Sequence, residues 1–488
     1  MPELERRRWR VLVVASVGVF MTAFTASVVS VALPVIGPHL HLSYSEALWV
    51  QAAYVLAFTV IASPVGRLAD MHGPLRLYTL GVLFFTASSV AAALSPSGLF
   101  LVIARGFQGV GGAAVLTSSP AIVTMAFPPA ERGRALGFNI MAATIGFALG
   151  PPLGGLLASH LGWRWIFLIG GPIAVLVLLA NWDLLGAERR DRTAEQELGT
   201  AGVVSRRIDG IGAVLLGMTL AALFVPLSFS PIWGWRNGPS IGLLAAAVIL
   251  GTLFVLVERR TKDPVIDLRL FRDNRVFAGA NTAGLLYFVA TWGVPVFAAL
   301  FLEIVQGHSA QRTGLVLLAQ SAVMGVFVSF AGRLADRVGP FGLAATGLVL
   351  VAAGVGQLAL VSSSAPLWRF IVALGTVGLG QAVFSPPNMS AIMGSVGRSK
   401  LGVASGVMFT TSGCGQGLSI AVLGAIAASK LGPTGGRVIL LGETASVSST
   451  RAFAAGFREA MLVGAGFALA AALASLARDR RPDRPDLA

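Results

Sequence analysis

Long apolar runs, separated by short polar stretches, follow one another along most of the chain. A helix needs about 20 apolar residues to cross the hydrocarbon core of a bilayer, and many of these runs reach that length. The pattern therefore predicts an all-α polytopic membrane protein with fourteen transmembrane helices. The predicted spans lie near residues 11–37, 46–66, 76–94, 99–121, 134–158, 163–184, 209–229, 239–258, 277–303, 312–332, 341–361, 368–393, 402–428 and 456–477.

Composition supports this interpretation. Of the 488 residues, 55% are hydrophobic and only 12% are charged, whereas a soluble domain carries about 25% charged residues. A net charge of +14 would suggest a nucleic-acid partner in a soluble protein. Here the basic residues lie in short loops, where they indicate topology instead. Most of them fall on one side of the predicted spans, so we expect both termini in the cytoplasm of a cell-membrane protein.

Other functional classes find little support in the residues. Cys414 is the only cysteine, so the chain forms no internal disulfide, and the five histidines fall at or outside predicted helix ends. We therefore expect no metal and no cofactor. The chain contains no Gly-x-x-x-x-Gly-Lys-Ser/Thr motif, which excludes a phosphate-binding loop of its own for ATP-driven pumping.

An internal repeat divides the chain. The segment 66–74, Gly-Arg-Leu-Ala-Asp-Met-His-Gly-Pro, returns 266 residues later as 332–340, Gly-Arg-Leu-Ala-Asp-Arg-Val-Gly-Pro. The spacing predicts two six-helix halves, 1–190 and 270–488, with two inserted helices and charged linkers at 191–269. Parallel repeats of this kind are typical of transporters whose substrate site lies at the repeat interface.

The repeated segment carries an aspartate at a helix junction. Such a carboxylate can accept hydrogen bonds from a facing helix N-terminus and complement its dipole. We therefore predict a conformational latch in both copies. Its residues are Gly66, Asp70 and Gly73 in the first copy, and Gly332, Asp336, Arg337 and Gly339 in the second.

Two further patterns lie within predicted spans. Arg105 and Gln108 belong to the fourth span, and a charge there suggests a functional site, although the arginine could also reach the outer interface by snorkelling. The fifth span contains Gly146, Gly150, Pro151, Gly154 and Gly155. Small residues four positions apart let helix backbones approach closely, and the proline bends the helix.

Taken in this order, the patterns resemble the fourteen-helix drug:proton antiporter family of the major facilitator superfamily over nearly the whole chain. The resemblance implies the major facilitator fold, a latch role for the repeated loop, proton coupling at Arg105, and export as the meaning of the fifth-span signature. One family residue is missing. The family has an acid nine residues before Pro34, where this chain has Thr25, so proton coupling is expected to involve Glu46 or Glu303 instead.

These expectations define a function. We predict a secondary active transporter, not an enzyme, that exports small amphipathic compounds such as drugs or antibiotics by proton antiport and acts as a monomer in the lipid bilayer. Uptake of a small metabolite, or a membrane-embedded enzyme acting on lipid, are the alternatives. Because the family acid is absent, we expect neutral or anionic substrates. Candidate substrate-binding residues are polar or aromatic and lie within spans: Thr22, Thr25, Gln51, Tyr54, Asn281, Tyr287, Trp292, Gln381 and Asn388.

Overall fold

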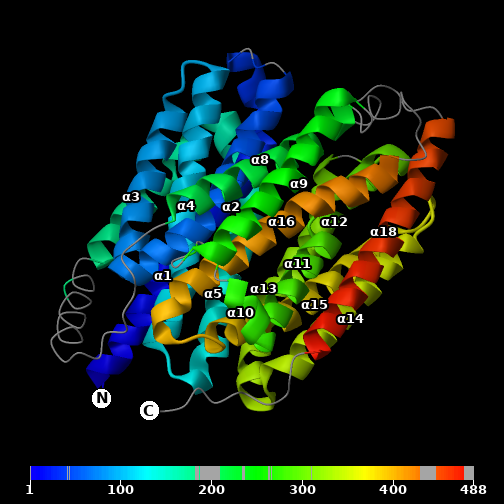
Figure 1. Ribbon diagram of the computed structural model, residues 1–488. Helices are drawn as coiled ribbons and strands as arrows, with labels where there is room; N and C mark the ends of the chain where they lie inside the picture. Colours follow the sequence, from blue (N-terminus) through cyan, green and yellow to red (C-terminus); the bar gives the residue numbers. More distant parts are fainter. Residues whose placement is uncertain are drawn as a thin grey trace. The chain divides into compact units, whose positions relative to one another are not determined.

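The computed structural model describes residues 2–40, 42, 44–181, 186, 209–233, 237–261, 264, 266, 268–308, 310–428 and 447–477. Its regular elements in these ranges are helices (Figure 1). The chain forms two compact units. The first contains Met1–Ile266 together with Gly397–Gly417, and the second contains Asp267–Val396 together with Leu418–Ala488. The predicted divisions at 190/191 and 269/270 stay predictions.

The first unit is built from long apolar helices that pack in pairs. The helix α1 packs against α5, α3 against α4, and α2 against α4. Because their side chains are apolar on most faces, these helices bury one side in the unit and leave another for lipid. Their bounds are α1 Pro2–Leu40, α2 Tyr44–His72, α3 Pro74–Ala93, α4 Gly98–Ala126, α5 Arg132–His160 and α6 Trp165–Leu168, followed by the start of α16 (Leu401–Ala428).

The first helix begins well before the predicted span, which starts at residue 11. Its polar N-terminal turns dock on the segment that joins α4 to α5. Arg8 Nη1 lies 3.2 Å from Glu131 Oε2, and the Arg134 guanidinium stacks 5.3 Å from the Trp9 ring centre. These contacts explain why the helix continues through a run of arginines that hydropathy alone would leave outside it.

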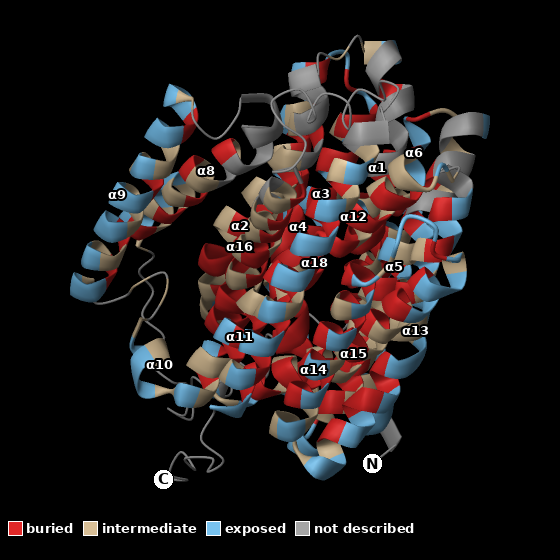
Figure 2. Cartoon of the chain, turned by 90° about the vertical axis from the view of Figure 1, so that its right-hand side faces the viewer, coloured by how far each residue is buried: buried red, intermediate tan, exposed pale blue. Residues whose placement is uncertain are grey.

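The two inserted helices pack against each other, and the first of them packs on α2. They are α8 (Gly210–Trp233) and α9 (Gly238–Arg260). Asp209 Oδ1 accepts the Gly212 N–H at 2.8 Å, and Asn237 Oδ1 accepts the Ser240 N–H at 2.7 Å, so each helix starts at a capping side chain. Much of α9 is exposed along its length (Figure 2), as expected for a helix that faces lipid.

The second unit has the same kind of construction. In it α14 packs against α15 and α18, while α13 packs against α15 and α11 against α18. Aromatic side chains pack among aliphatic ones in its core; Phe301, for example, packs against Phe370 and Phe457. The bounds are α10 Leu268–Asp273, α11 Arg275–Thr291, α12 Val294–Leu300, a π-helical turn Phe301–Val305, α13 Ala310–Val338, α14 Pro340–Ala359, α15 Leu367–Gly394 and α18 Val447–Leu476.

The predicted span 277–303 lies within one membrane-length segment, Arg275–Val305. Its helix is interrupted between Thr291 and Val294 and ends in a π-helical turn. Pro295 lacks an N–H and lies in the first turn of α12, which favours a new helix start there. The Gly293 N–H leaves the helix ladder and donates to Ser419 Oγ at 2.9 Å.

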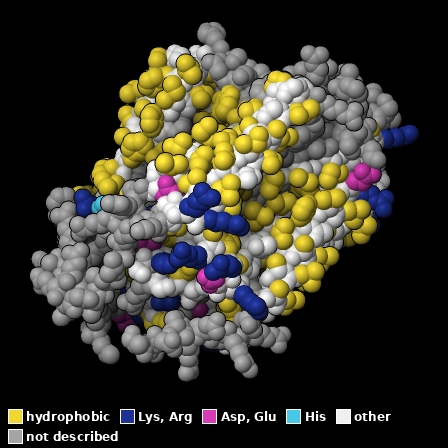
Figure 3. Space-filling model, in the orientation of Figure 1, with side chains coloured by type: hydrophobic (Ala, Val, Ile, Leu, Met, Phe, Trp, Pro, Cys, Tyr) yellow, Lys and Arg dark blue, Asp and Glu magenta, His cyan; other side chains and the backbone are white. Residues whose placement is uncertain are grey.

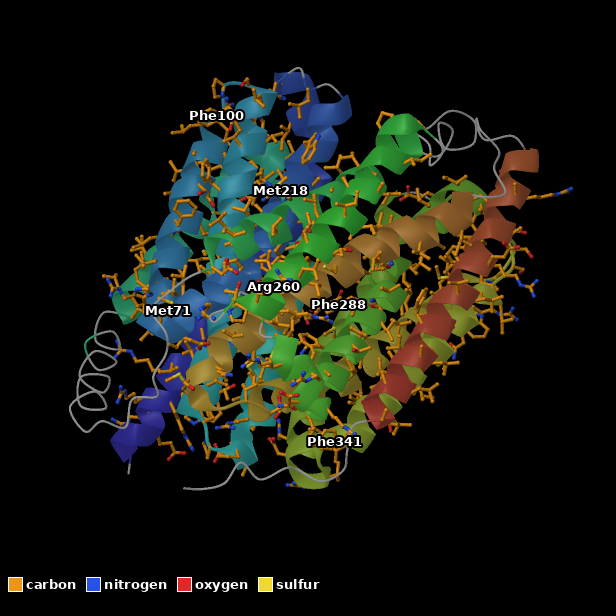
Figure 4. All side chains as sticks on the ribbon, viewed as in Figure 1. Met71, Phe100, Met218, Arg260, Phe288 and Phe341 are labelled. Carbon is orange, nitrogen blue, oxygen red and sulfur yellow. The ribbon has the colours of Figure 1, made fainter. Side chains whose placement is uncertain are left out.

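The number of spans is settled in part. Among the described residues, ten helices are long and apolar enough to cross a membrane, and the segments Trp165–Asn181 and Gly210–Leu223 are shorter apolar helices. The count of fourteen therefore stays a prediction. Hydrophobic side chains cover much of the described surface in Figure 3, and several Lys and Arg side chains lie near the centre of that view. Arg259 and Arg260, in the last turn of α9, are such helix-end charges; Arg260 is labelled in Figure 4.

Candidate functional site

The first copy of the repeated loop holds Asp70 in the last turn of α2. Gly73 adopts a φ of 102°, which favours glycine, and Pro74 then starts α3. Asp70 Oδ1 accepts the Gly402 N–H at 2.5 Å, and Asp70 Oδ2 accepts the Val403 N–H at 2.8 Å. Both amides belong to the first turn of α16, so the carboxylate satisfies two unpaired helix donors and lies at the positive end of the helix dipole. The sequence pattern predicted a contact of this type, between an aspartate and the N-terminus of a facing helix.

Glycines bring α2 and α16 close enough for that contact. A Cβ placed on Gly66 would lie 2.1 Å from the Gly402 carbonyl oxygen, and one on Gly406 would lie 2.7 Å from the Ala62 carbonyl oxygen. About two turns further along α16, a Cβ on Gly413 would lie 2.3 Å from Thr59 Oγ1. Any larger side chain on this line would separate the helices. Figure 4 labels Met71, which follows Asp70 in α2, and Phe100, near the start of α4.

The second copy of the loop repeats the backbone geometry. Gly339 has a φ of 87° and precedes Pro340 at the start of α14. Its N–H donates to the Ala335 carbonyl at 3.0 Å, as the Gly73 N–H donates to Ala69 at 2.9 Å. Asp336 is half-buried, Gly332 is buried and Arg337 is exposed. The two copies therefore agree in local fold as well as in sequence.

The arginines next to the two aspartates differ in their contacts. Arg67 Nη1 donates to the Pro264 carbonyl at 2.7 Å, in the linker that follows the inserted helices. Its counterpart Arg333 is exposed and stacks on the Phe330 ring, 5.0 Å from its centre. Only the first-copy arginine thus shows a bond to the linker of the inserted pair among the described contacts.

A polar chain centred on Arg105 links α2, α3 and α4. Arg105 has 0% of its surface exposed, so it does not snorkel to the interface. Its Nε donates to the Val50 carbonyl at 3.0 Å, Nη1 donates to Gln108 Oε1, and the guanidinium lies 4.4 Å from the Tyr54 ring centre. Gln108 Nε2 in turn donates to Ser89 Oγ at 2.6 Å. The predicted residues Arg105, Gln108 and Tyr54 therefore lie in one side-chain cluster.

The glycines of the fifth span lie against α1. A Cβ on Gly146 would lie 2.6 Å from the Phe20 carbonyl oxygen, one on Gly150 would lie 1.8 Å from Ser27 Oγ, and one on Gly154 would lie 2.5 Å from Val28 Cγ2. These three positions form a continuous close contact along one helix face. Pro151 and Gly155, the other members of the signature, lie in α5, but their side-chain surroundings fall outside the described part.

In the second unit, buried polar side chains gather between α11, α13 and α15. Gln320 Nε2 donates to Gln381 Oε1 at 3.1 Å, and the side chains of Gln381, Ser385 and Thr291 lie within hydrogen-bonding reach of the Tyr287 hydroxyl. Asn388 Nδ2 would lie 3.5 Å from a Cβ on Gly284. The structure thus joins predicted Tyr287 and Gln381 and places Asn388 nearby.

The other predicted residues have contacts of different kinds. Thr22 and Thr25 donate to carbonyls of their own helix, at 2.8 Å to Val19 and 2.9 Å to Met21, and Asn281 donates to the Phe277 carbonyl at 3.0 Å. Trp292 is 36% exposed, and Glu303 is exposed in the π-helical turn. The side chains of Glu46 and Gln51 lie outside the described part.

Sequence reasoning missed Ser89 and Gln320. Both are buried polar residues within apolar spans, and that intramembrane position is the signal by which they could have been found. Among the described residues, no group of three His, Cys, Asp or Glu side chains could hold a metal ion.

The chain is also similar to known proteins. A family model described as "Major Facilitator Superfamily" matches residues 15–420 and 283–488. The chain is 34% identical over 432 residues to "Multidrug resistance protein Stp" of Mycobacterium tuberculosis, covering 88% of this chain and 78% of that protein. It is 30% identical over 429 residues to "Tetracenomycin C resistance and export protein" of Streptomyces glaucescens, with the same coverage. A solved structure of the proton:xylose symporter XylE matches with a TM-score of 0.64 and 14% identity, covering 96% of this chain and 94% of that one.

Proposed function

Because the chain belongs to the major facilitator superfamily, we propose that it exports small amphipathic compounds in exchange for protons, by alternating access. It is a multi-pass membrane transporter, and the predicted resemblance is confirmed. The alternative of a lipid-acting enzyme is wrong, since fold and relatives are those of transporters. The proposal also includes four finer points: the export direction, proton antiport, a cell-membrane orientation with both termini inside, and a monomeric state.

The α1–α5 contact carries the export proposal. Three glycines pack so tightly on α1 that no side chain would fit between the backbones, and they belong to the sequence signature that resembles exporters. Two similar proteins are named for resistance or export, which supports the same direction. Uptake of a metabolite remains the alternative, but no specific contact in the described part favours it.

We assign Asp70 to a latch between α2 and α16. The carboxylate bridges two backbone amides of another helix, and such a contact has to break whenever that helix end moves away. Its geometry supports a role in stabilising one conformation of the cycle. We extend the role to Asp336, because its loop has the same fold and sequence, with a φ of 87° at the following Gly339.

Proton coupling is assigned to Arg105 with Gln108, and to Glu46 or Glu303 as the acid. Arg105 is buried in the first unit, whereas Glu303 is exposed in a π-helical turn of the second. Rare π-turns are frequent at functional sites, which supports the choice of Glu303. Substrate contacts are assigned to Tyr54 in the first unit, and to the polar cluster with Tyr287 and Gln381 in the second.

Transport by the purified protein in liposomes tests this proposal. A pH gradient is imposed across the vesicle membrane, and accumulation of a fluorescent amphiphile is followed together with internal pH. Antiport predicts uphill substrate movement coupled to proton movement in the opposite direction, and loss of the coupling in either Glu303→Gln or Glu46→Gln. Equilibration of the amphiphile that ignores the pH gradient in the unmodified protein would contradict proton coupling.

A further inference from the structure

The guanidinium of Arg105 uses only part of its hydrogen-bonding capacity. Arginine presents five N–H donors in a rigid planar fork. The Nε group is taken by the Val50 carbonyl and Nη1 by Gln108, but Nη2 is buried and has no hydrogen-bond partner in the described part of the chain. Buried donors are nearly always paired, and an unpaired donor on a charged group is more costly than one on a neutral group.

The positive charge of Arg105 also has no negatively charged partner in the described part of the chain. Its contacts in the described part are a backbone carbonyl, an amide oxygen and the face of the Tyr54 ring, and all of these groups are neutral. A cation within a membrane span is expensive unless an anion accompanies it, and for that reason such a residue is usually functional. An anion near Nη2 would remove both deficits at once.

The surroundings fix the guanidinium in position. Gln108 is itself held by a bond to Ser89 on α3, while Val50 belongs to α2 and Arg105 to α4. Three helices therefore orient the guanidinium and leave its Nη2 group unused. A charged N–H donor held in this way suits the oxygen of a carboxylate or similar oxyanion.

We propose that Arg105 binds a carboxylate or similar oxyanion through Nη2, and that the anion is the acidic group of an amphipathic substrate. The role in transport rests on the proposed export function, but the binding itself does not. Arg105 has 0% exposure, so the anion reaches it in a state in which the helices around it have moved apart. The site thus selects monoanionic amphiphiles and disfavours cationic ones.

Two other anions compete for the same position. A chloride ion from solution shares the charge but not the planar shape. Glu46 lies one helical turn before Val50 on α2, and its carboxylate could be a counterion supplied by the protein. The experiment therefore has to separate substrate, inorganic ion and protein carboxylate.

The test uses the purified full-length chain and three probes with one aromatic body: naphthoate, naphthamide and naphthylmethylammonium. Binding is measured by thermal shift and by fluorescence titration, without any transport step. We expect naphthoate to bind about tenfold or more tightly than naphthamide, the ratio that one charged hydrogen bond corresponds to. Arg105→Gln should remove this preference and leave the affinity for naphthylmethylammonium unchanged or improved.

Arg164→Gln is the matched control. Arg164 also stacks on an aromatic ring, 4.6 Å from the centre of Trp163, but it is exposed, so its loss should leave the carboxylate preference unchanged. If Arg105→Gln does not fold, Arg105→Lys keeps the charge without the fork and should weaken the preference. The ratio of the naphthoate and naphthamide affinities in the unmodified protein tests the inference without any variant.

The outcomes are separable. Equal binding of naphthoate and naphthamide by the unmodified protein would overturn the inference, as would a carboxylate preference that emerges only in Glu46→Gln. Binding of chloride alone that depends on Arg105, without binding of naphthoate, would assign the site to an inorganic ion and overturn the substrate assignment. Arg105-dependent binding of naphthoate without its transport in liposomes would support the site and refute the proposed export function for this class.

Discussion

Replacing Gly150 tests how closely α1 and α5 have to approach. A Cβ at this position would lie 1.8 Å from Ser27 Oγ, 2.9 Å from Ser27 Cβ and 3.0 Å from the Val28 backbone nitrogen. The serine hydroxyl can rotate away, at the cost of its bond to the Phe24 carbonyl, but the other two atoms cannot. Since ordinary contact begins at 3.4 Å, even alanine requires the helices to separate locally by about 0.5 Å.

Leucine demands far more space. Its side chain adds three carbons beyond Cβ, and the helix face on either side of Gly150 has no room for them. A Cβ at Gly146 would already lie 2.6 Å from the Phe20 carbonyl oxygen, and one at Gly154 would lie 2.5 Å from Val28 Cγ2. Overpacking a well-packed core costs about 1–3 kcal/mol, so we expect Gly150→Ala near the lower end of that range and Gly150→Leu at or above its upper end. The protein should still insert, because its hydropathy is unchanged or raised.

The assay compares the unmodified protein with Gly150→Ala, Gly150→Leu and the control Gly171→Leu. Gly171 has open space where its Cβ would lie, so leucine there should be tolerated. Thermal stability, amphiphile efflux from liposomes and proton leak are measured on each. We expect graded loss of stability from alanine to leucine, with lost efflux or a proton leak in Gly150→Leu. Unchanged stability and normal efflux in Gly150→Leu would refute the packing argument.

Three further predictions concern the latch and the topology. Asp70→Asn should lower turnover and keep equilibrium substrate affinity within a few-fold, because the carboxylate contacts helix amides and not substrate; a large loss of affinity at unchanged turnover would reverse the assignment. Arg67→Ala should increase proteolytic access to the Pro264 linker, since its bond to that carbonyl is lost, whereas the exposed counterpart variant Arg333→Ala should not. Tags at both termini and in the 259–275 linker should be accessible only from the cytoplasm, and labelling of any of them from outside would contradict the fourteen-span topology.

Hydropathy and the internal repeat were enough to predict most helices and the shared geometry of the two repeated loops. The apolar runs fix where helices lie, because their length has to match the bilayer. The duplicated segment predicted that Gly73 and Gly339 share a conformation, and both have positive φ. The glycines of the fifth span predicted close packing, although not that α1 would be the partner.

What the sequence could not provide is pairing between distant segments. Asp70 and Gly402 are 332 residues apart, and no local pattern states which helix start an aspartate will cap. The stacking of Arg105 on Tyr54 depends in the same way on how α2 and α4 are rotated. The break after Thr291 did have a local signal in Gly293 and Pro295, but hydropathy averages across it. Glu303 is exposed within a π-helical turn, and no hydrophobic periodicity predicts such a turn.

The contact at Asp70 limits which substitutions this protein can accept during evolution. Its acceptor is a side chain, but its donors are backbone amides of Gly402 and Val403, which no substitution other than proline removes. A Cβ at position 402 would lie 2.7 Å from Asp70 Oδ1 and 2.1 Å from the Gly66 carbonyl. Descendants should therefore preserve an acid at 70 and glycine at 402 independently. Compensating charge exchange between the two positions, the usual trace of an ion pair, should not occur.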